Sequence, residues 1–177
     1  MSAIVTVPDP ILRQSAKPVE TVDKRLLEII ADMTSALISA KDPEGVGLAA
    51  PQIGVPLRLF LARPDMHKPP LLFINPEIIK YSQRQQRPDS KKGVFEGCLS
   101  IPNHYSPIRR SLSVTVRYQS LDGNQFVSKT ENFSGFTAHI IQHEMDHLNG
   151  ILFIDHTLAQ NSKLYLIKGE VWEEVNL

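Results

Sequence analysis

The segment HEMDH at residues 143–147 constrains this chain more than any other feature of its sequence. Its two histidines are four residues apart, and side chains at this spacing lie on one face of an α-helix, one turn from each other. In a helical segment, His143 and His147 can bind a single metal ion, and Glu144 lies next to the first ligand, where it can act as a general base. The segment therefore predicts a metal-binding helix at the centre of the fold.

The boundaries of this helix can be read from the flanking residues. Ser134 is suited to the N-cap position, and Gly150 to the left-handed position that follows a helix, so we predict a helix over residues 135–148. Apolar residues at helical spacing predict another helix over residues 23–40, and a last helix is expected within residues 158–175. Strands are predicted at 57–62, 71–74, 113–118 and 125–132, the last two joined by an Asp-Gly turn, with loops at 45–56 and 81–92.

Strands and helices do not alternate regularly along the chain, which favours an α+β fold with antiparallel β-sheets around the metal-binding helix. The length of 177 residues is typical of a single domain, expected here over residues 1–177. Nineteen basic and nineteen acidic residues balance, so no surplus of positive charge indicates a nucleic acid or an anionic membrane as partner. One cysteine, no signal peptide and no apolar run of about 20 residues predict a soluble, cytoplasmic protein.

A catalytic metal ion of this kind needs a third protein ligand. The extended pattern H-E-x-x-H-x-x-G-x-x-H fails because Phe153 stands where its last histidine is required. Glu170, about twenty residues downstream, would complete the site of a zinc endopeptidase. Cys98 is the other candidate, and Gly97 before it lets backbone approach closely. His139 lies one helical turn before His143, too far along the axis to share the ion, so we expect it to line a pocket or lie at the surface.

Three segments, in this order, resemble the peptide deformylase family: GVGLAAPQ at residues 45–52, EGCLS at 96–100 and HEMDH at 143–147. The segment VPDPILRQSAKPV at residues 7–19 resembles the opening of that family, so the resemblance spans residues 7–155. It implies a metal-dependent hydrolase that removes the N-formyl group from the initiator methionine of nascent polypeptides and releases formate. The substrate would then be an N-formyl-methionyl peptide, met transiently at the ribosome.

The resemblance also implies roles for individual residues. The metal ligands would be Cys98, His143 and His147, holding Fe²⁺ with Zn²⁺, Ni²⁺ or Co²⁺ as substitutes. Glu144 would move the proton, and the donors to the developing oxyanion would be the Gln52 side-chain amide and the Leu99 backbone N–H. A metal-binding or ribosome-docking module without catalysis is the remaining alternative, and the presence of both Glu144 and Gln52 argues against it.

Substrate contacts are expected around the methionine side chain and along the backbone that follows it. Many bacterial members of the family have an arginine a few residues after the second motif, where this chain has His104 and Tyr105, and a neutral residue there predicts a weaker dependence on the charge of the peptide. The residues expected to contact the substrate are Gly45, Val46, Gly47, Val94, Gly97, His139 and Ile140.

Overall fold

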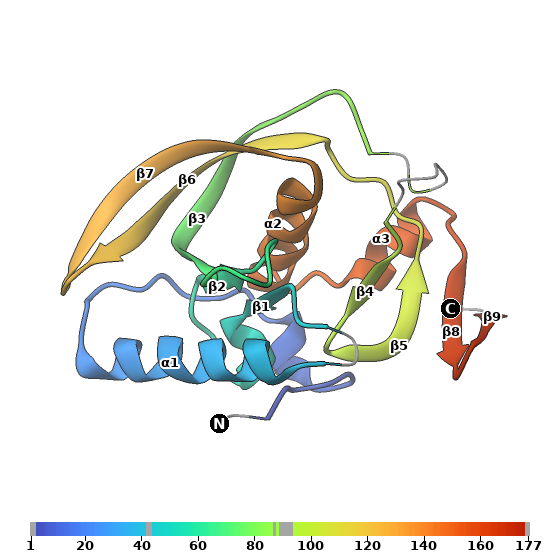
Figure 1. Cartoon of the computed structure of the whole chain (residues 1–177), viewed down its shortest axis with the longest axis horizontal. Helices are drawn as coiled ribbons and strands as arrows, with labels where there is room; N and C mark the ends of the chain where they lie inside the picture. Colours follow the sequence, from blue (N-terminus) through green and yellow to red (C-terminus); the bar gives the residue numbers. More distant parts are fainter. Residues whose placement is uncertain (1–2, 42–43, 87, 89–93, 176–177) are drawn as a thin grey trace.

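The computed structural model describes residues 3–41, 44–86, 88 and 94–175. Within these residues three α-helices pack with two antiparallel β-sheets, so the predicted α+β class is confirmed. Figure 1 shows one helix, α2, at the centre, with the curved strands of one sheet over it and α1 below. The predicted central helix is therefore where the sequence placed it.

The larger sheet has five strands in the order β1-β2-β3-β6-β7, and the smaller has four in the order β4-β5-β8-β9. All neighbouring strands are antiparallel. The larger sheet consists of β1 (Gly47–Ala49), β2 (Leu59–Ala62), β3 (Leu71–Tyr81), β6 (Ser113–Asp122) and β7 (Gln125–Ser134). The smaller consists of β4 (Glu96–Cys98), β5 (Ile101–Ser106), β8 (Leu164–Lys168) and β9 (Val171–Val175).

The helix α2 runs over Gly135–Leu148, the boundaries that the sequence predicts, although the Ser134 side chain makes no capping hydrogen bond. Gly150 follows it with a φ of 71°, as expected for the residue after a helix end. Ile140 and Ile141 pack with Phe60 and Phe73 of the larger sheet in one buried cluster. Because most of its residues are buried, α2 is held on nearly all sides and can position side chains accurately.

The helix α1 (Lys24–Ser39) also agrees with the sequence prediction. It begins after Asp23, whose side chain accepts a hydrogen bond of 2.8 Å from the Leu26 N–H. Its buried residues Met33 and Leu37 join a second apolar cluster with Leu48 of β1. This packing fixes β1 between α1 and α2, which matters for the site described below.

Two predictions for these segments differ from the structure, and a third falls partly outside the described residues. Residues 45–56 are not only a loop, since they contain β1 and a 3-10 helix, η2 (Ala50–Ile53). The strand β3 continues past the predicted end at residue 74 to Tyr81, with register shifts where it passes Pro76. The loop predicted at 81–92 is described only in part, because residues 87 and 89–93 lie outside the described residues; within it, Gln85 pairs with Ser111.

The prediction of a last helix within residues 158–175 is wrong. A short helix, α3 (Phe153–Ala159), is followed by a hairpin of β8 and β9 that extends the smaller sheet. The hairpin turns at Gly169, which has a φ of 62° and so adopts a conformation that other residues reach at a cost. The flanking sequences LYLIK and VWEEV are rich in aromatic and β-branched residues, which favour strands over helix.

Candidate metal centre

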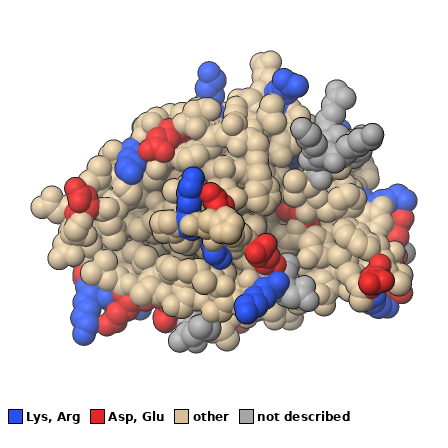
Figure 2. Space-filling model, viewed as in Figure 1, with Lys and Arg blue, Asp and Glu red and all other residues tan. Residues whose placement is uncertain are grey.

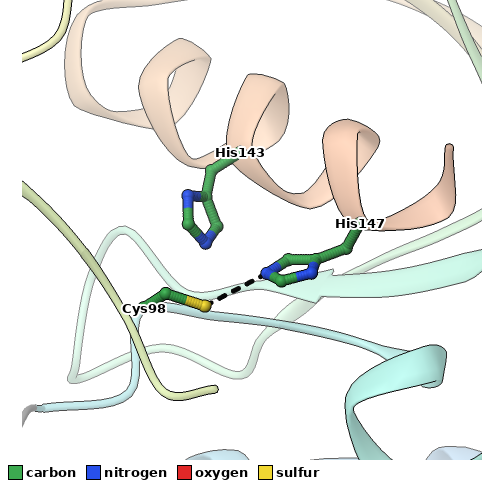
Figure 3. Close-up of side chains that lie close together, drawn as sticks. All are labelled: Cys98, His143 and His147. Carbon is green, nitrogen blue, oxygen red and sulfur yellow. Dashed lines mark hydrogen bonds between the residues drawn. The ribbon is translucent and has the colours of Figure 1, made fainter. Parts of the chain in front are cut away.

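Three buried side chains, Cys98, His143 and His147, converge at the point where α2 meets the end of β4 (Figure 3). Their candidate ligand atoms all lie within 4.8 Å of one another, and the Cys98 Sγ is 3.2 Å from His147 Nε2. Two ligands of one tetrahedral ion, at bond lengths of about 2.3 Å for sulfur and about 2.0 Å for nitrogen, stand roughly 3.5 Å apart. The observed separation is close to that value, so the donor set fits a single ion.

The orientation of His143 is set by Glu96, a buried residue on β4. The Nδ1 atom of His143 lies 2.7 Å from Glu96 Oε1, which leaves its Nε2 atom for the metal cluster. Arg110 holds Glu96 through two contacts, at 2.9 Å from Nε and 2.6 Å from Nη2. Arg110 also donates from Nη1 to Asp146 of α2 at 2.6 Å. This network fixes the orientation of the His143 ring through its Nδ1 atom, as residues that hydrogen-bond to metal ligands commonly do.

Sequence reasoning did not identify the pair of Glu96 and Arg110. A signal was present, because an acidic residue between apolar neighbours in a short strand has to be paired if the strand is buried. What the sequence does not reveal is which of nineteen basic residues supplies the partner. The answer depends on a contact between residues fourteen positions apart, on either side of β5.

The two histidines differ in their protonation. Burial lowers the pKa of His147 well below its usual value, and the nearby His143 lowers it further, so His147 is neutral, which is the form that binds metal ions. Burial alone would also lower the pKa of His143, but the carboxylate of Glu96 and the sulfur of Cys98 raise it well above its usual value. A bound cation competes with that proton and favours neutral His143.

Glu144 lies beside the cluster with its carboxylate buried. Its Oε2 atom has no hydrogen-bond partner among the residues that the structure describes. Burial raises the pKa of Glu144 to about 7, with Glu96 and Asp146 adding to the effect. A carboxylate with a pKa near neutral pH is suited to accept and return a proton.

Gln52 and Leu99, the expected oxyanion donors, both lie at the cluster. The Oε1 atom of Gln52 accepts from the Ala49 N–H at 2.8 Å, which orients the amide. Its Nε2 atom donates to Cys98 Sγ at 3.6 Å and to Ser100 Oγ at 3.2 Å. Leu99 lies in the turn directly after Cys98, and both residues line the same cavity. The long N–H···S contact is weak, so that amide hydrogen can turn to a substrate oxygen at low cost.

The cavity beside the cluster has a volume of about 150 Å³. Cavities of about this volume bind molecules of the size of benzene, so one side chain of medium size fits. Gly45 does not line it, because Gly45 packs against Leu37 and Ala40 at the end of α1. The other residues expected to contact the substrate do line it, namely Val46, Gly47, Val94, Gly97, His139 and Ile140.

The alternative third ligand, Glu170, is not near the cluster. It is exposed in the turn between β8 and β9, and among the described residues the ligand group that includes both helix histidines is completed by Cys98. The zinc endopeptidase built on Glu170 is therefore wrong. His139 is buried, lines the cavity and has its Nε2 atom 2.8 Å from Glu96 Oε2, which agrees with the pocket-lining position expected for it.

Charges on the surface are mixed. On the face shown in Figure 2, basic and acidic side chains are scattered among uncharged ones and do not form a continuous patch of one sign. None of the described helices combines the length and the apolar character that a membrane span requires.

Comparison with known proteins gives a consistent result. The sequence profile of the family described as Polypeptide deformylase matches residues 1–163. The chain is 45% identical over 156 residues to a peptide deformylase from Agrobacterium fabrum, covering 86% of this chain and 85% of the relative. It is 41% identical over 167 residues to one from Pseudothermotoga lettingae, covering 94% and 88%.

Solved structures agree with the sequence comparisons. The peptide deformylase from Thermotoga maritima superposes with a TM-score of 0.74 at 38% identity, over 88% of this chain and 97% of that one. The peptide deformylase from Synechococcus elongatus in complex with actinonin has a TM-score of 0.76 at 36% identity, over 88% and 78%.

Proposed function

The chain belongs to the polypeptide deformylase family, and from this premise we propose how its own residues carry out the family's reaction, the removal of the N-formyl group from nascent polypeptides. The enzyme is a metal-dependent hydrolase that acts on N-formyl-methionyl peptides. The observation that supports this assignment of roles most strongly is the convergence of Cys98, His143 and His147, next to a cavity that Cys98, His143 and Glu144 line.

We propose that Cys98, His143 and His147 hold the metal ion. One sulfur and two imidazole nitrogens form a soft to borderline donor set that suits Fe²⁺ and also accepts Zn²⁺, Ni²⁺ or Co²⁺. Fe²⁺ is the ion we propose for the working enzyme. When bound, a divalent ion supplies Lewis acidity, which makes a water molecule more acidic and polarises the formyl carbonyl.

In the proposed reaction Glu144 takes the proton from the attacking water, whose oxygen forms a bond to the formyl carbon. The bond from that carbon to the methionine nitrogen then breaks, and Glu144 returns the proton to the leaving amine. Formate and a free amino terminus are the products. Gln52 Nε2 and the Leu99 N–H would donate to the developing oxyanion, and loss of one such donor costs about 100- to 1000-fold in rate.

We propose that the cavity holds the methionine side chain. Val46, Val94, His139 and Ile140 supply its walls, and Gly47 allows the substrate backbone to pass close to β1. Because formylated amino termini emerge during translation, we place the enzyme in the cytoplasm, in transient contact with the ribosome.

We further propose that residues 1–177 act as one catalytic domain. In support, the C-terminal hairpin pairs with β5, so it shares a sheet with the strand that carries Cys98. The two larger apolar clusters lie on either side of β1 and β2, which join them.

A formate-release assay tests the function. Protein purified without oxygen and loaded with Fe²⁺ is incubated with formyl-Met-Ala-Ala, and formate is measured together with the free amino terminus. N-acetyl-Met-Ala-Ala, which has one more methyl group at the reacting carbonyl, is the control and should react much more slowly. The proposal fails if the metal-loaded protein releases no formate.

A further inference from the structure

Four aromatic side chains gather on the smaller sheet: Phe95, Tyr105, Tyr165 and Trp172, here called the aromatic cluster. Trp172 is at its middle, with ring centroids 5.3 Å from Phe95, 5.6 Å from Tyr105 and 6.0 Å from Tyr165. Phe95 and Tyr165 are 5.8 Å apart. These residues come from β5, β8, β9 and the segment before β4, so the C-terminal hairpin supplies half of the cluster.

The aromatic cluster is continuous with the catalytic cavity, because Phe95 and Tyr105 belong to both. Tyr105 pairs with Gly97 on the neighbouring strand, and a Cβ atom placed on Gly97 would lie 2.5 Å from Tyr105 Cε1. The ring of Tyr105 therefore lies across the backbone of Gly97, one residue from Cys98. A surface of rings thus leads from the candidate metal centre to Trp172.

Part of this aromatic surface faces solvent. Trp172 is 48% exposed and Phe95 is 37% exposed. Large rings that remain accessible next to a cavity are typical of binding sites, because covering them removes much apolar surface from water while few torsions are frozen. Packing against the other described residues covers only part of the rings of Trp172 and Phe95, and the rest of each ring is accessible.

The charged residues that line the cavity indicate which substrate side chains can bind next to it. Its described lining includes the carboxylates of Glu44, Glu96 and Glu144 and no lysine or arginine. Glu96 is already paired with Arg110, whereas Glu44 lies at the cavity without a role in the proposed reaction. Among the described lining residues, an acidic side chain of the substrate would meet charges of its own sign, whereas an aromatic or apolar side chain would not.

We propose that the aromatic cluster binds the first or second residue after the formylated methionine and selects aromatic or large apolar side chains there. This inference rests on the proposed function. A polypeptide held by its methionine in a cavity for one side chain must continue out of it, and Phe95 and Tyr105 form the wall that leads to Trp172. Trp172 and Tyr105 are then specificity-determining residues contributed by β9 and β5.

Peptide selectivity provides the first test. The kcat/KM is measured for formyl-Met-Ala-Ala, formyl-Met-Phe-Ala, formyl-Met-Ala-Phe and formyl-Met-Asp-Ala. One ring contact should favour at least one of the two phenylalanine peptides over the alanine peptide by about threefold to tenfold. Trp172→Ala should reduce that ratio to near one, and Trp172→Phe should restore most of it. Equal values for the phenylalanine and alanine peptides, or a ratio unchanged in Trp172→Ala, would overturn the proposal.

Val171→Ala is the matched control. Val171 precedes Trp172 on β9, is 58% exposed and points to the opposite face of the strand. Its substitution changes the same hairpin without touching the rings, so the ratios should equal those of the wild type. If Val171→Ala changed the kcat/KM ratios as much as Trp172→Ala does, the effect would come from the hairpin as a whole. The aromatic cluster would then not be responsible for the selectivity.

A binding measurement needs no substitution in the aromatic cluster. Trp172 is the only tryptophan of the chain, so its emission reports on this surface alone. In metal-loaded Glu144→Gln protein, saturating formyl-Met-Phe-Ala or formyl-Met-Ala-Phe should shift that emission to shorter wavelengths, whereas formyl-Met-Ala-Ala should shift it less. Identical emission with all three peptides would refute the proposal.

The two proposals fail in different ways. If no peptide of the series releases formate with wild-type protein, the proposed function is wrong. If all peptides release formate at similar kcat/KM, the proposed function stands and the aromatic cluster is not a substrate site.

Discussion

The carboxylate of Glu144 occupies the space in which any side chain on Gly47 would lie. A Cβ atom placed on Gly47 would be 2.2 Å from Glu144 Oε1 and 2.9 Å from Ile140 Cγ2. Gly47 is on β1 and Glu144 on α2, so the close approach of these two elements depends on a residue without a side chain. The position of the proposed proton carrier is therefore determined partly by a residue that has no functional group.

We predict that Gly47→Ala lowers kcat by roughly 100-fold while the protein keeps its metal. The added methyl group must push the carboxylate away from the water that it has to deprotonate, and proton transfer of this kind contributes about 100- to 10,000-fold. Metal analysis and a thermal melt of the same preparation separate this effect from loss of the ion or of the fold. A kcat near that of the wild type would show that Glu144 adjusts without consequence.

Glu144→Gln should have an effect in the same range or larger, also with the metal retained. The amide has nearly the same shape as the carboxylate but cannot take a proton, so binding remains and the proton transfer is lost. Because Gly47→Ala acts through the same carboxylate, combining both substitutions should cost little more than Glu144→Gln alone. Losses that multiply would mean that Gly47 acts on something other than Glu144.

Cys98→Ser should strip the metal, whereas Glu170→Ala should leave it in place. A hydroxyl is a poor replacement for a thiolate toward a borderline ion, and Cys98 is the only sulfur in the ligand group. Glu170 is exposed in a turn, so its removal affects no side chain of the cluster. Metal content per chain after gel filtration decides the matter, and an intact metal content in Cys98→Ser would contradict the proposed ligand set.

Some of this structure can be predicted from sequence because the decisive signals are local. The α2 boundaries follow from Ser134 and Gly150, and the spacing of His143 and His147 implies that both face one point. The ligand from β4 is harder, because Cys98 and Glu170 both satisfy the sequence pattern. Only their distances from His143 and His147 in the folded structure distinguish the two candidates, and no local sequence pattern encodes those distances.

The C-terminal hairpin and the pair of Glu96 and Arg110 were missed for related reasons. Residues 158–175 have enough apolar residues to suggest a helix, but the strand preference of LYLIK and VWEEV prevails once β5 offers an edge to pair with. Arg110 can be identified as the partner of Glu96 only once the structure shows that Glu96 is buried, because a buried carboxylate without a partner costs too much free energy. Both results depend on tertiary contacts, which periodicity along the chain does not encode.

Arg110→Met should destabilise the protein strongly. Arg110 and Glu96 are almost completely buried, and removal of Arg110 takes the guanidinium away from both Glu96 and Asp146 and leaves their carboxylates facing only histidine rings among the described residues. Breaking a buried ion pair in this way typically costs about 3 to 5 kcal/mol. The neighbouring Arg109 is exposed, so Arg109→Met is a matched control and should change the free energy of unfolding by less than about 0.5 kcal/mol. Urea unfolding of both variants in the metal-free state avoids a contribution from metal binding. Equal stability of the two variants would show that the buried pair has no net role in folding.

The acid dependence of stability should include a contribution from Asp155, at the start of α3. Burial would raise the pKa of Asp155, but its carboxylate accepts hydrogen bonds from Arg13 and from the Leu152 N–H, and these contacts lower the pKa below its usual value. A carboxylate with a depressed pKa in the folded state stabilises the protein above its unfolded pKa of about 4, and that stabilisation is lost as the pH falls through the folded pKa.

Asp155→Asn keeps an oxygen for the Leu152 N–H but loses the charge that pairs with Arg13. Its deficit in free energy of unfolding should therefore be present at pH 6 and should shrink below about pH 4. Asp122→Asn, at the exposed end of β6, is the control and should show no such trend. A deficit for Asp155→Asn that is the same at pH 3 and pH 6 would mean that the charge of Asp155 is not what holds α3 to the N-terminal segment.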